Sequence, residues 1–175
     1  CRSCRGVLVF FVGSLGIGLG RWFLEAGVHG GAFPAKEPKS KQDTPQDSWE
    51  AARLLGCSVR DVEANRPAAV SELQRRYGGV VLLKGAGTLI ADGKTLRLCH
   101  AGNPGMASGG MGDLLSGIIG ALWGQGLPQA VAAWVGACVH GEAGDLAAES
   151  GERGMLASDL LPFIRRLVNP AESSG

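Results

Sequence analysis

Hydrophobic and polar positions divide the chain into an irregular first part and a strongly patterned second part. A short β-branched and aromatic run at residues 7–12, VLVFFV, predicts a buried strand that ends in a glycine-rich turn. The segment 21–27 has the pattern of a helix beginning. Residues 28–47 are polar and rich in turn-forming residues, and we predict no regular element there.

From residue 48 onward the apolar positions alternate between strand spacing and helical spacing. Glycines mark the expected ends of several of these elements. The predicted elements, in chain order, are helices at 48–56 and 66–77, a buried strand at 80–85, a hairpin at 88–99 around Asp92-Gly93, and helices at 113–126, 127–150 and 157–168. Strands that alternate with helices favour an α/β layered fold with a largely parallel sheet and one antiparallel hairpin.

Composition and charge exclude some classes of partner. The chain has 175 residues, enough for one domain with a core, and a net charge of +1, which favours neither nucleic acid nor a membrane surface as partner. The apolar run near the N-terminus is interrupted by glycines and is shorter than the ~20 residues of a membrane span. Five scattered cysteines are expected to be incidental thiols in a reducing cytoplasm. The 29 glycines indicate tight turns or close approach of the backbone to a ligand.

The segment GNPGMASGGMGDLLSG, residues 102–117, carries the strongest chemical signal because six glycines precede or open a predicted helix. A glycine-rich turn that leads into a helix presents unpaired N–H groups and the positive end of the helix dipole to an anion. Asp113, at the junction, has two interpretations. It either caps the helix or serves as a general base beside a phosphoryl group.

A second candidate segment is KGAGT, residues 84–88, which directly follows a predicted buried strand. Open α/β sheets bind ligands at the C-terminal ends of their strands, so Lys84 is expected either to meet a nucleotide phosphate or to extend into solvent. Gly93-Lys94-Thr95 looks like part of a P-loop, but the required glycine five residues earlier is Thr88 and the context is a hairpin. We interpret it as a turn.

The histidines give no support to a metal site. His140 lies in a predicted apolar helix and is expected to be a core or helix-end residue. Glu142 and Asp145 beside it match no metal-ligand spacing, and we predict no metal-ligating residues. No GxSxG elbow or Cys–His arrangement supports nucleophilic hydrolysis.

Several segments together resemble one known family. The motifs EAARLLG, GGVVLLKGAGTLIADG, GNPGMASGGMGDLLSGIIGAL and HGEAGDLAAESGERGMLASDLL are similar, in this order, to the C-terminal part of ADP/ATP-dependent NAD(P)H-hydrate dehydratase. The resemblance covers residues 50–169, about two-thirds of the chain. It implies a ribokinase-like layered fold, truncated at the N-terminus, with a mostly parallel sheet flanked by helices.

The resemblance also implies an activity and a set of site residues. The family uses ADP or ATP with Mg²⁺ to phosphorylate the hydroxyl of hydrated NADH or NADPH, and elimination of phosphate then restores the nicotinamide. Asp113 would be the catalytic base and face the hydrate. An NAD(P)H-hydrate epimerase and a second copy of the chain are the protein partners to consider. By position, Lys84, Gly85, Ala86, Gly87, Thr88 and Gly112 would bind the nucleotide, Gly18 and Asp47 the substrate, and Gly109, Gly110, Met111 and Gly112 would form the anion hole.

The first part of the chain departs from the family pattern. Asp47 stands where the family has a substrate-contacting histidine, and the segment before AARLLG keeps only Glu50 of the family's motif. We expect residues 1–49 to be a divergent or damaged segment, from a frameshift, a deletion or a fragmentary gene model. Residues 50–170 would be the dehydratase part and 171–175 a tail. Two rival hypotheses remain: a catalytically silent remnant that binds adenine nucleotide, and a ribokinase-like vitamin-precursor kinase.

Overall fold

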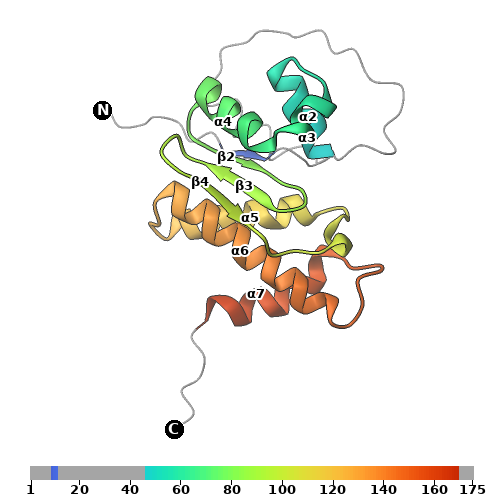
Figure 1. Cartoon of the computed structure of the whole chain (residues 1–175). Coiled ribbons are helices and arrows are strands. Elements are labelled where there is room, and N and C mark those ends of the chain that lie inside the picture. The colour runs from blue at the N-terminus through green and yellow to red at the C-terminus, as the bar shows by residue number, and fades with distance from the viewer. Residues whose placement is uncertain (1–8, 12–45, 170–175) are drawn as a thin grey trace.

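The computed structural model describes residues 9–11 and 46–169 (Figure 1). A small sheet lies between two groups of helices in this part of the chain. In chain order the elements are β1 (Val9–Phe11), α2 (Gln46–Leu55), α3 (Val59–Ala64), α4 (Arg66–Tyr77), β2 (Val80–Leu83), β3 (Thr88–Ala91), β4 (Leu96–Cys99), the 3-10 turn η1 (Pro104–Met106), α5 (Met111–Gly124), α6 (Gln129–Ala148), the 3-10 turn η2 (Ala157–Leu160) and α7 (Leu161–Val168).

The described sheet has the strand order β1-β2-β3-β4, and most of its pairing is antiparallel. β1 runs parallel to β2, whereas β2 pairs antiparallel with β3, and β3 antiparallel with β4. The prediction of a largely parallel sheet is therefore wrong for the described strands. The reason is the connections, because the loops from β2 to β3 and from β3 to β4 are too short to hold the crossover that a parallel pair needs.

The turn at Asp92-Gly93 was predicted correctly as a hairpin turn, and it is not part of a phosphate loop. Asp92 Oδ1 accepts hydrogen bonds from the N–H groups of Lys94 and Thr95, at 2.8 and 2.6 Å. Gly93 has a φ of +83°, a conformation that side chains other than glycine's rarely adopt. The connection between β3 and β4 spans four residues, because Ala91 pairs directly with Leu96.

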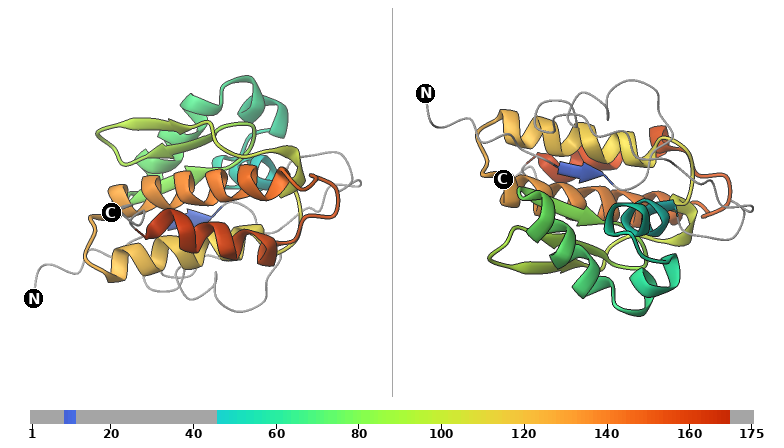
Figure 2. Two further views of the ribbon diagram at one scale, coloured as in Figure 1. Left: turned by 90° about the horizontal axis from the view of Figure 1, so that it is seen from below. Right: turned by 90° about the horizontal axis from the view of Figure 1, so that it is seen from above.

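Successive strand residues point to opposite faces of the sheet, and in β2 and β3 both faces are buried, whereas Leu96 and Leu98 of β4 are exposed. One face packs on α2, α3 and α4, and the other packs on α5 and α6 (Figures 1 and 2). Strand residues on the first face are Val81, Leu83, Leu89 and Ala91, and those on the second are Val80, Leu82, Ile90 and Cys99. A strand was predicted at residues 80–85, and β2 is observed at Val80–Leu83. Its burial on two sides explains why all four of its residues are apolar.

The helices follow the apolar pattern of the sequence closely. α2 ends before Gly56, which has a φ of +72°, and α4 ends at Gly78. α5 buries Leu115, Ile118 and Ile119, while Trp123 near its end is 38% exposed. The additional helix α3 was not predicted, and Ser58 caps it by accepting a hydrogen bond from the Asp61 N–H.

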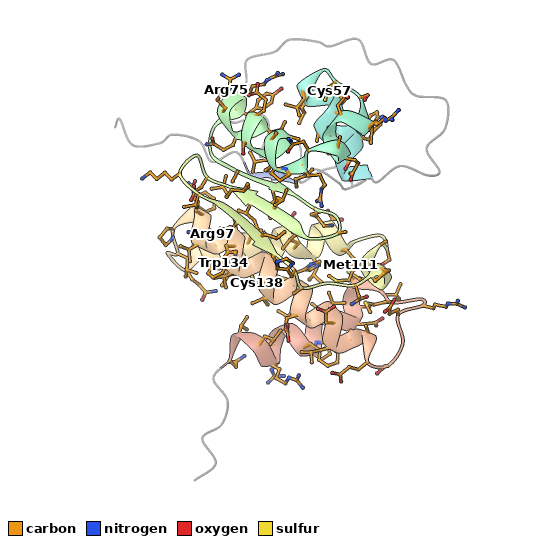
Figure 3. The ribbon with its side chains drawn as sticks, in the orientation of Figure 1. Cys57, Arg75, Arg97, Met111, Trp134 and Cys138 are labelled. Atoms are coloured by element: carbon orange, nitrogen blue, oxygen red, sulfur yellow. The ribbon has the colours of Figure 1, made fainter. Side chains whose placement is uncertain are left out.

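α6 is the longest described helix and lies against the sheet, α5 and α7. Its buried positions are all small residues or His140, which allows neighbouring backbones to approach closely. At its edge, the Arg97 guanidinium of β4 lies 5.4 Å from the ring centre of Trp134 (Figure 3). Within the described residues no helix is both long and apolar enough to cross a membrane.

Candidate functional site

The first segment of the candidate site is the loop of residues 84–87, which joins β2 to β3. Lys84 directly follows the last residue of β2 and is half-buried, so its expected position at the strand end is confirmed. Gly85 and Gly87 have φ values of +143° and +81°, which explains why glycine occupies both positions. Ala86 is exposed between them, and Thr88 opens β3.

Arg66 shapes this loop, although nothing in the sequence pattern pointed to it. Its Nη1 donates to the carbonyl oxygen of Ala86 at 2.9 Å. Its Nη2 lies within hydrogen-bonding distance of three more loop carbonyls, at 2.8 to 3.2 Å: those of Leu83, Lys84 and Gly87. The only sequence signal at this position was a helix start, since Asn65 caps α4 and Pro67 lies in its first turn.

The second segment is the start of α5, where Asp113 lies. The helix begins at Met111 after Gly110, whose φ is +84°, and no side chain caps it. Its first N–H groups therefore remain available, as an anion site requires. Asp113 is the third helical residue and is exposed, and it makes no hydrogen bond or ion pair with any residue that the structure describes. Asp113 is therefore not the N-cap residue, but it is an acidic residue of the first helical turn, where the helix dipole favours a negative charge.

The remaining predicted anion-hole residues lie in the same turn. Gly109 is exposed, and a Cβ on it would meet no atom of the described chain within 4 Å. Met111, in contrast, is 1% exposed, and Gly112 is also buried. The backbone of residues 109–110 is thus open to a ligand, while residues 111–112 anchor the helix start in the core.

Asp145 of α6 holds the beginning of the glycine-rich stretch and was not recognised as a functional residue from the sequence. Its Oδ2 accepts a hydrogen bond from the Gly102 N–H at 2.9 Å, and its Oδ1 accepts one from Asn103 Nδ2 at 3.0 Å. Asn103 in turn accepts from the Gly105 N–H at 3.0 Å. The position of this stretch therefore depends on a carboxylate that is distant in sequence.

Two glycines of α6 let the same stretch lie directly against the helix. A Cβ built on Gly141 would come within 2.5 Å of the Ala101 carbonyl oxygen, and one on Gly144 would overlap Met106 Sδ. Gly105 itself approaches the Glu152 carbonyl oxygen, where a Cβ would be 2.5 Å away. Several glycines of the site region thus serve backbone packing, and only some of them remain open to a ligand.

His140 is a buried residue of α6 whose pKa is influenced by residues of both segments. It is 4% exposed, its Nε2 is buried without a partner among the described residues, and burial lowers its pKa to about 4. The positive charge of Lys84 also lowers this pKa, while a backbone hydrogen bond with Met111 acts in the opposite direction. Lys84 and the start of α5 thus both influence the pKa of one buried imidazole. The prediction of a core histidine is confirmed.

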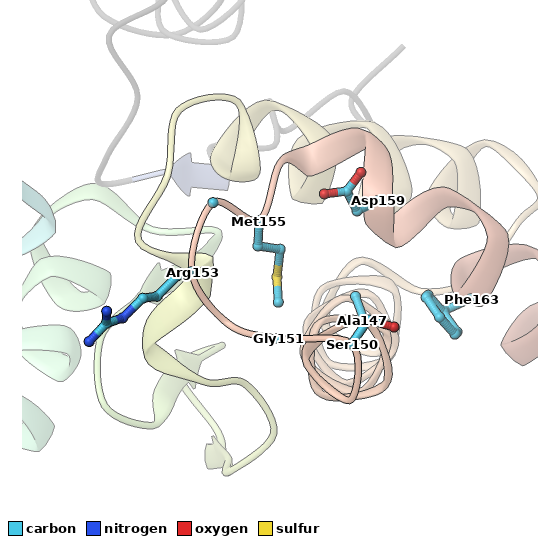
Figure 4. Close-up of a pocket in the computed structure, with 8 residues that line it drawn as sticks. Ala147, Ser150, Gly151, Arg153, Met155, Asp159 and Phe163 are labelled. Atoms are coloured by element: carbon cyan, nitrogen blue, oxygen red, sulfur yellow. The ribbon is translucent and has the colours of Figure 1, made fainter.

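Two cavities lie beside the site, and neither is lined by Lys84 or Asp113. One, of about 330 Å³, separates residues 104–108 from residues 152–155. The other, of about 260 Å³, lies between the end of α6 and α7, where Met155 points inward and the Arg153 side chain extends away (Figure 4). The first cavity therefore borders the glycine-rich stretch without including the predicted base.

Two predicted substrate residues are not placed by the structure. Gly18 lies outside the described residues, and Asp47 is in the first turn of α2, with a side chain that lies outside the described part. No group of three or more His, Cys, Asp or Glu side chains in the described ranges could hold a metal ion.

Comparison with known proteins defines the family. Residues 44–166 match the family model of NAD(P)H-hydrate dehydratase, and the chain belongs to this family. The bifunctional NAD(P)H-hydrate repair enzyme Nnr of Vibrio cholerae is 62% identical over 121 residues, which are 69% of this chain and 24% of the relative. The ADP-dependent (S)-NAD(P)H-hydrate dehydratase of Neisseria meningitidis is 46% identical over 123 residues, 69% of this chain and 42% of the relative.

A solved structure supports the same assignment. The ADP/ATP-dependent NAD(P)H-hydrate dehydratase from Bacillus subtilis, co-crystallized with ATP and Mg²⁺, superposes with a TM-score of 0.65 and 26% identity. The match covers 69% of this chain and 44% of that one. The chain thus spans about a quarter of the length of the bifunctional relative and under half of the dehydratases, and its fold is a part of the dehydratase fold.

Proposed function

We propose that this chain carries the nucleotide half of an ADP- or ATP-dependent NAD(P)H-hydrate dehydratase. Two segments of the described chain support this most directly. One is the loop that begins with Lys84, and the other is the uncapped start of α5 with the free carboxylate of Asp113. A strand-end lysine and a helix N-terminus together favour a phosphorylated ligand.

In the proposed site, the loop residues Gly85, Ala86, Gly87 and Thr88 contact the adenine nucleotide, and Lys84 meets its phosphates. The open backbone at Gly109 and Gly110 and the buried turn at Met111 and Gly112 provide N–H donors for the transferred phosphoryl group. Gly18 and Asp47 complete the substrate side in this proposal.

Asp113 acts as the base in this proposal. Its carboxylate takes the proton of the hydrate hydroxyl while that oxygen attacks the terminal phosphorus of ADP, and AMP leaves. The C–O bond to the phosphate group then breaks while the neighbouring carbon loses a proton, and the electron pair of that C–H bond restores the carbon–carbon double bond of NADH or NADPH. A divalent cation such as Mg²⁺ neutralises phosphate charge in such sites and is held largely by the phosphate oxygens.

The proposal also includes a location and a partner. We expect the protein to act in a reducing cytoplasm, together with a fused or separate NAD(P)H-hydrate epimerase. Cys57, Cys99 and Cys138 are free thiols, as expected of proteins in that compartment. The bifunctional relatives support a second repair activity alongside this one.

The test uses the purified chain with hydrated NADH, ADP and magnesium, and follows recovery of the reduced-nicotinamide absorbance. Asp113→Asn is expected to lower the rate by roughly 10²–10⁴-fold, the usual contribution of a general base. Glu149→Gln, which changes an exposed carboxylate at the end of α6, is the matched control and should leave the rate unchanged. Equal rates for Asp113→Asn and the unchanged chain would contradict the role of Asp113.

A nucleotide-binding chain without turnover is the second candidate function. It is favoured by the sequence QDSWE at residues 46–50, where Asp47 replaces the histidine that the family resemblance leads us to expect. This candidate predicts that ADP raises the melting temperature of the chain while no NADH is recovered. Turnover that depends on Asp113 would exclude it.

A further inference from the structure

The guanidinium of Arg66 is enclosed by backbone carbonyls of the loop between β2 and β3. Nη1 donates to Ala86, and Nη2 lies 3.2, 2.8 and 3.0 Å from the carbonyl oxygens of Leu83, Lys84 and Gly87. Nη2 carries two hydrogens, so three acceptors require one hydrogen to be shared. A single side chain from α4 therefore sets the direction of four peptide groups in a short loop.

These contacts also determine where the loop N–H groups point. In a trans peptide the C=O and the following N–H point in opposite directions, and the described residues contain no cis peptide. Since the Lys84 and Ala86 carbonyls face Arg66, the N–H groups of Gly85 and Gly87 face away from it. Neither N–H donates a backbone hydrogen bond within the described ranges. The loop thus presents donors on the side opposite the guanidinium.

The glycine at position 85 is an independent sign that the guanidinium and the loop are fitted to each other. A Cβ on Gly85 would lie 2.6 Å from Arg66 Nη2, and the φ of Gly85 is +143°. The helix dipole opposes a cation in the first turn of α4, so the local helix does not favour arginine at this position. The loop carbonyls supply the compensating interaction.

We propose that Arg66 is a positioning residue of the nucleotide site. It orders residues 84–87 so that the Gly85 and Gly87 N–H groups face the phosphate or sugar oxygens of a nucleoside diphosphate. Lysine is a poor substitute, because an ammonium group cannot reach four separated carbonyls with the planar fork of a guanidinium. The proposal rests on the proposed function for the identity of the ligand, while the loop geometry that it uses is independent of turnover.

The test measures ADP affinity by calorimetry for the full chain, Arg66→Lys and the control Arg60→Lys, which changes an exposed arginine of α3. Arg66→Lys is expected to bind ADP at least tenfold more weakly, and Arg60→Lys as the unchanged chain does. Amide NMR spectra of the variants add a second measurement. A general structural role of Arg66 would change signals throughout the protein, whereas a positioning role changes those of the loop alone. The Gly85 and Gly87 signals of the ADP-free Arg66→Lys protein should shift or broaden, while that of Gly112 stays in place.

Each outcome has one meaning. Equal ADP affinity and unchanged Gly85 and Gly87 signals in Arg66→Lys overturn this inference alone. Loss of signal dispersion throughout the Arg66→Lys spectrum also overturns it, because Arg66 would then support the whole fold. ADP binding to the unchanged chain without turnover overturns the enzymatic proposal and leaves this inference standing. Failure of the unchanged chain to bind ADP overturns both.

Discussion

Two glycine-rich segments meet at the candidate site and are held in different ways. The loop of residues 84–87 is shaped by the guanidinium of Arg66, which contacts its carbonyls through hydrogen bonds. The stretch of residues 101–106 is placed by α6, through the closeness of Gly141 and Gly144 and through the carboxylate of Asp145. The conformation of the first segment is therefore set mainly by directed hydrogen bonds. The position of the second is set mainly by close packing of backbones, which leaves no room for larger side chains.

The difference has a consequence for mutations. A change in the first segment should alter ligand binding more than stability, because the loop is largely exposed. A change in the second should alter stability first, because close backbone packing leaves no room for added atoms. The pKa of His140 is influenced by Lys84 of the first segment and by Met111 at the start of α5.

The largest expected effect is a loss of stability as His140 becomes protonated on acidification. Its pKa in the folded chain, about 4, is below the ordinary 6.5, so the unfolded chain binds the proton first. Stability should fall as the pH decreases from 6.5 towards 4, by up to about 3 kcal/mol. Denaturant unfolding at a series of pH values measures this loss, and His140→Gln should lack it.

The control for this prediction is His100→Gln, which changes an exposed histidine and should keep the pH dependence of the unchanged chain. Carboxylates at the surface also lose stabilisation in acid. An example is Glu72, which accepts hydrogen bonds from Arg75 and Arg76 that lower its pKa to about 2. They contribute equally to both proteins, so the difference between the curves isolates His140. Parallel curves for the unchanged chain and His140→Gln would contradict the prediction.

The second prediction compares two glycines of α6. In Gly141→Ala the new Cβ meets the Ala101 backbone, which cannot move away cheaply, and we expect a loss of about 2 kcal/mol. In Gly144→Ala the Cβ meets the flexible Met106 side chain, and the ~1 kcal/mol gained in helix propensity offsets much of the cost. Free energies of unfolding from denaturant titrations measure both. Equal losses would mean that the packing of residue 101 on α6 has no special role.

The smallest effect on stability is expected in the first segment. Gly85→Ala and Gly78→Ala each place alanine at positive φ, at +143° and +73°, and each should cost about 1 kcal/mol. A Cβ meets Arg66 only at position 85, since none of the described atoms lies within 4 Å of a Cβ on Gly78. ADP affinity should therefore fall in Gly85→Ala and stay constant in Gly78→Ala. Equal ADP affinities would remove the distinction between the two segments.

Most local features of the described part could be predicted from the sequence. The positions of Lys84 at a strand end and Asp113 at a helix start followed from apolar patterning and glycines, which act over a few residues. The antiparallel pair of β3 and β4 was predicted correctly, but that of β2 and β3 was not, because the pattern of a strand buried on both faces is typical of parallel sheets. The short connections, which force antiparallel neighbours, carried the correct information.

The supporting residues of the site could not be predicted in the same way. Arg66 had the appearance of a helix-start residue, and Asp145 that of a carboxylate that matches no metal-ligand spacing. Each acts on a segment that is distant in sequence, and no periodicity connects such pairs. His140 was predicted to be buried, but the influence of Lys84 and Met111 on its pKa came only from the packing of α6.

The sequence by itself determined most of the helices and strands, the position of the proposed base and the family of the chain, because these depend on short motifs and on local periodicity. Tertiary structure alone decided which glycines stay open to a ligand and which are used for packing. It also decided that one guanidinium and one carboxylate hold the two segments of the site. The physical reason is that these contacts join distant parts of the chain, and only the folded backbone brings them within hydrogen-bonding distance.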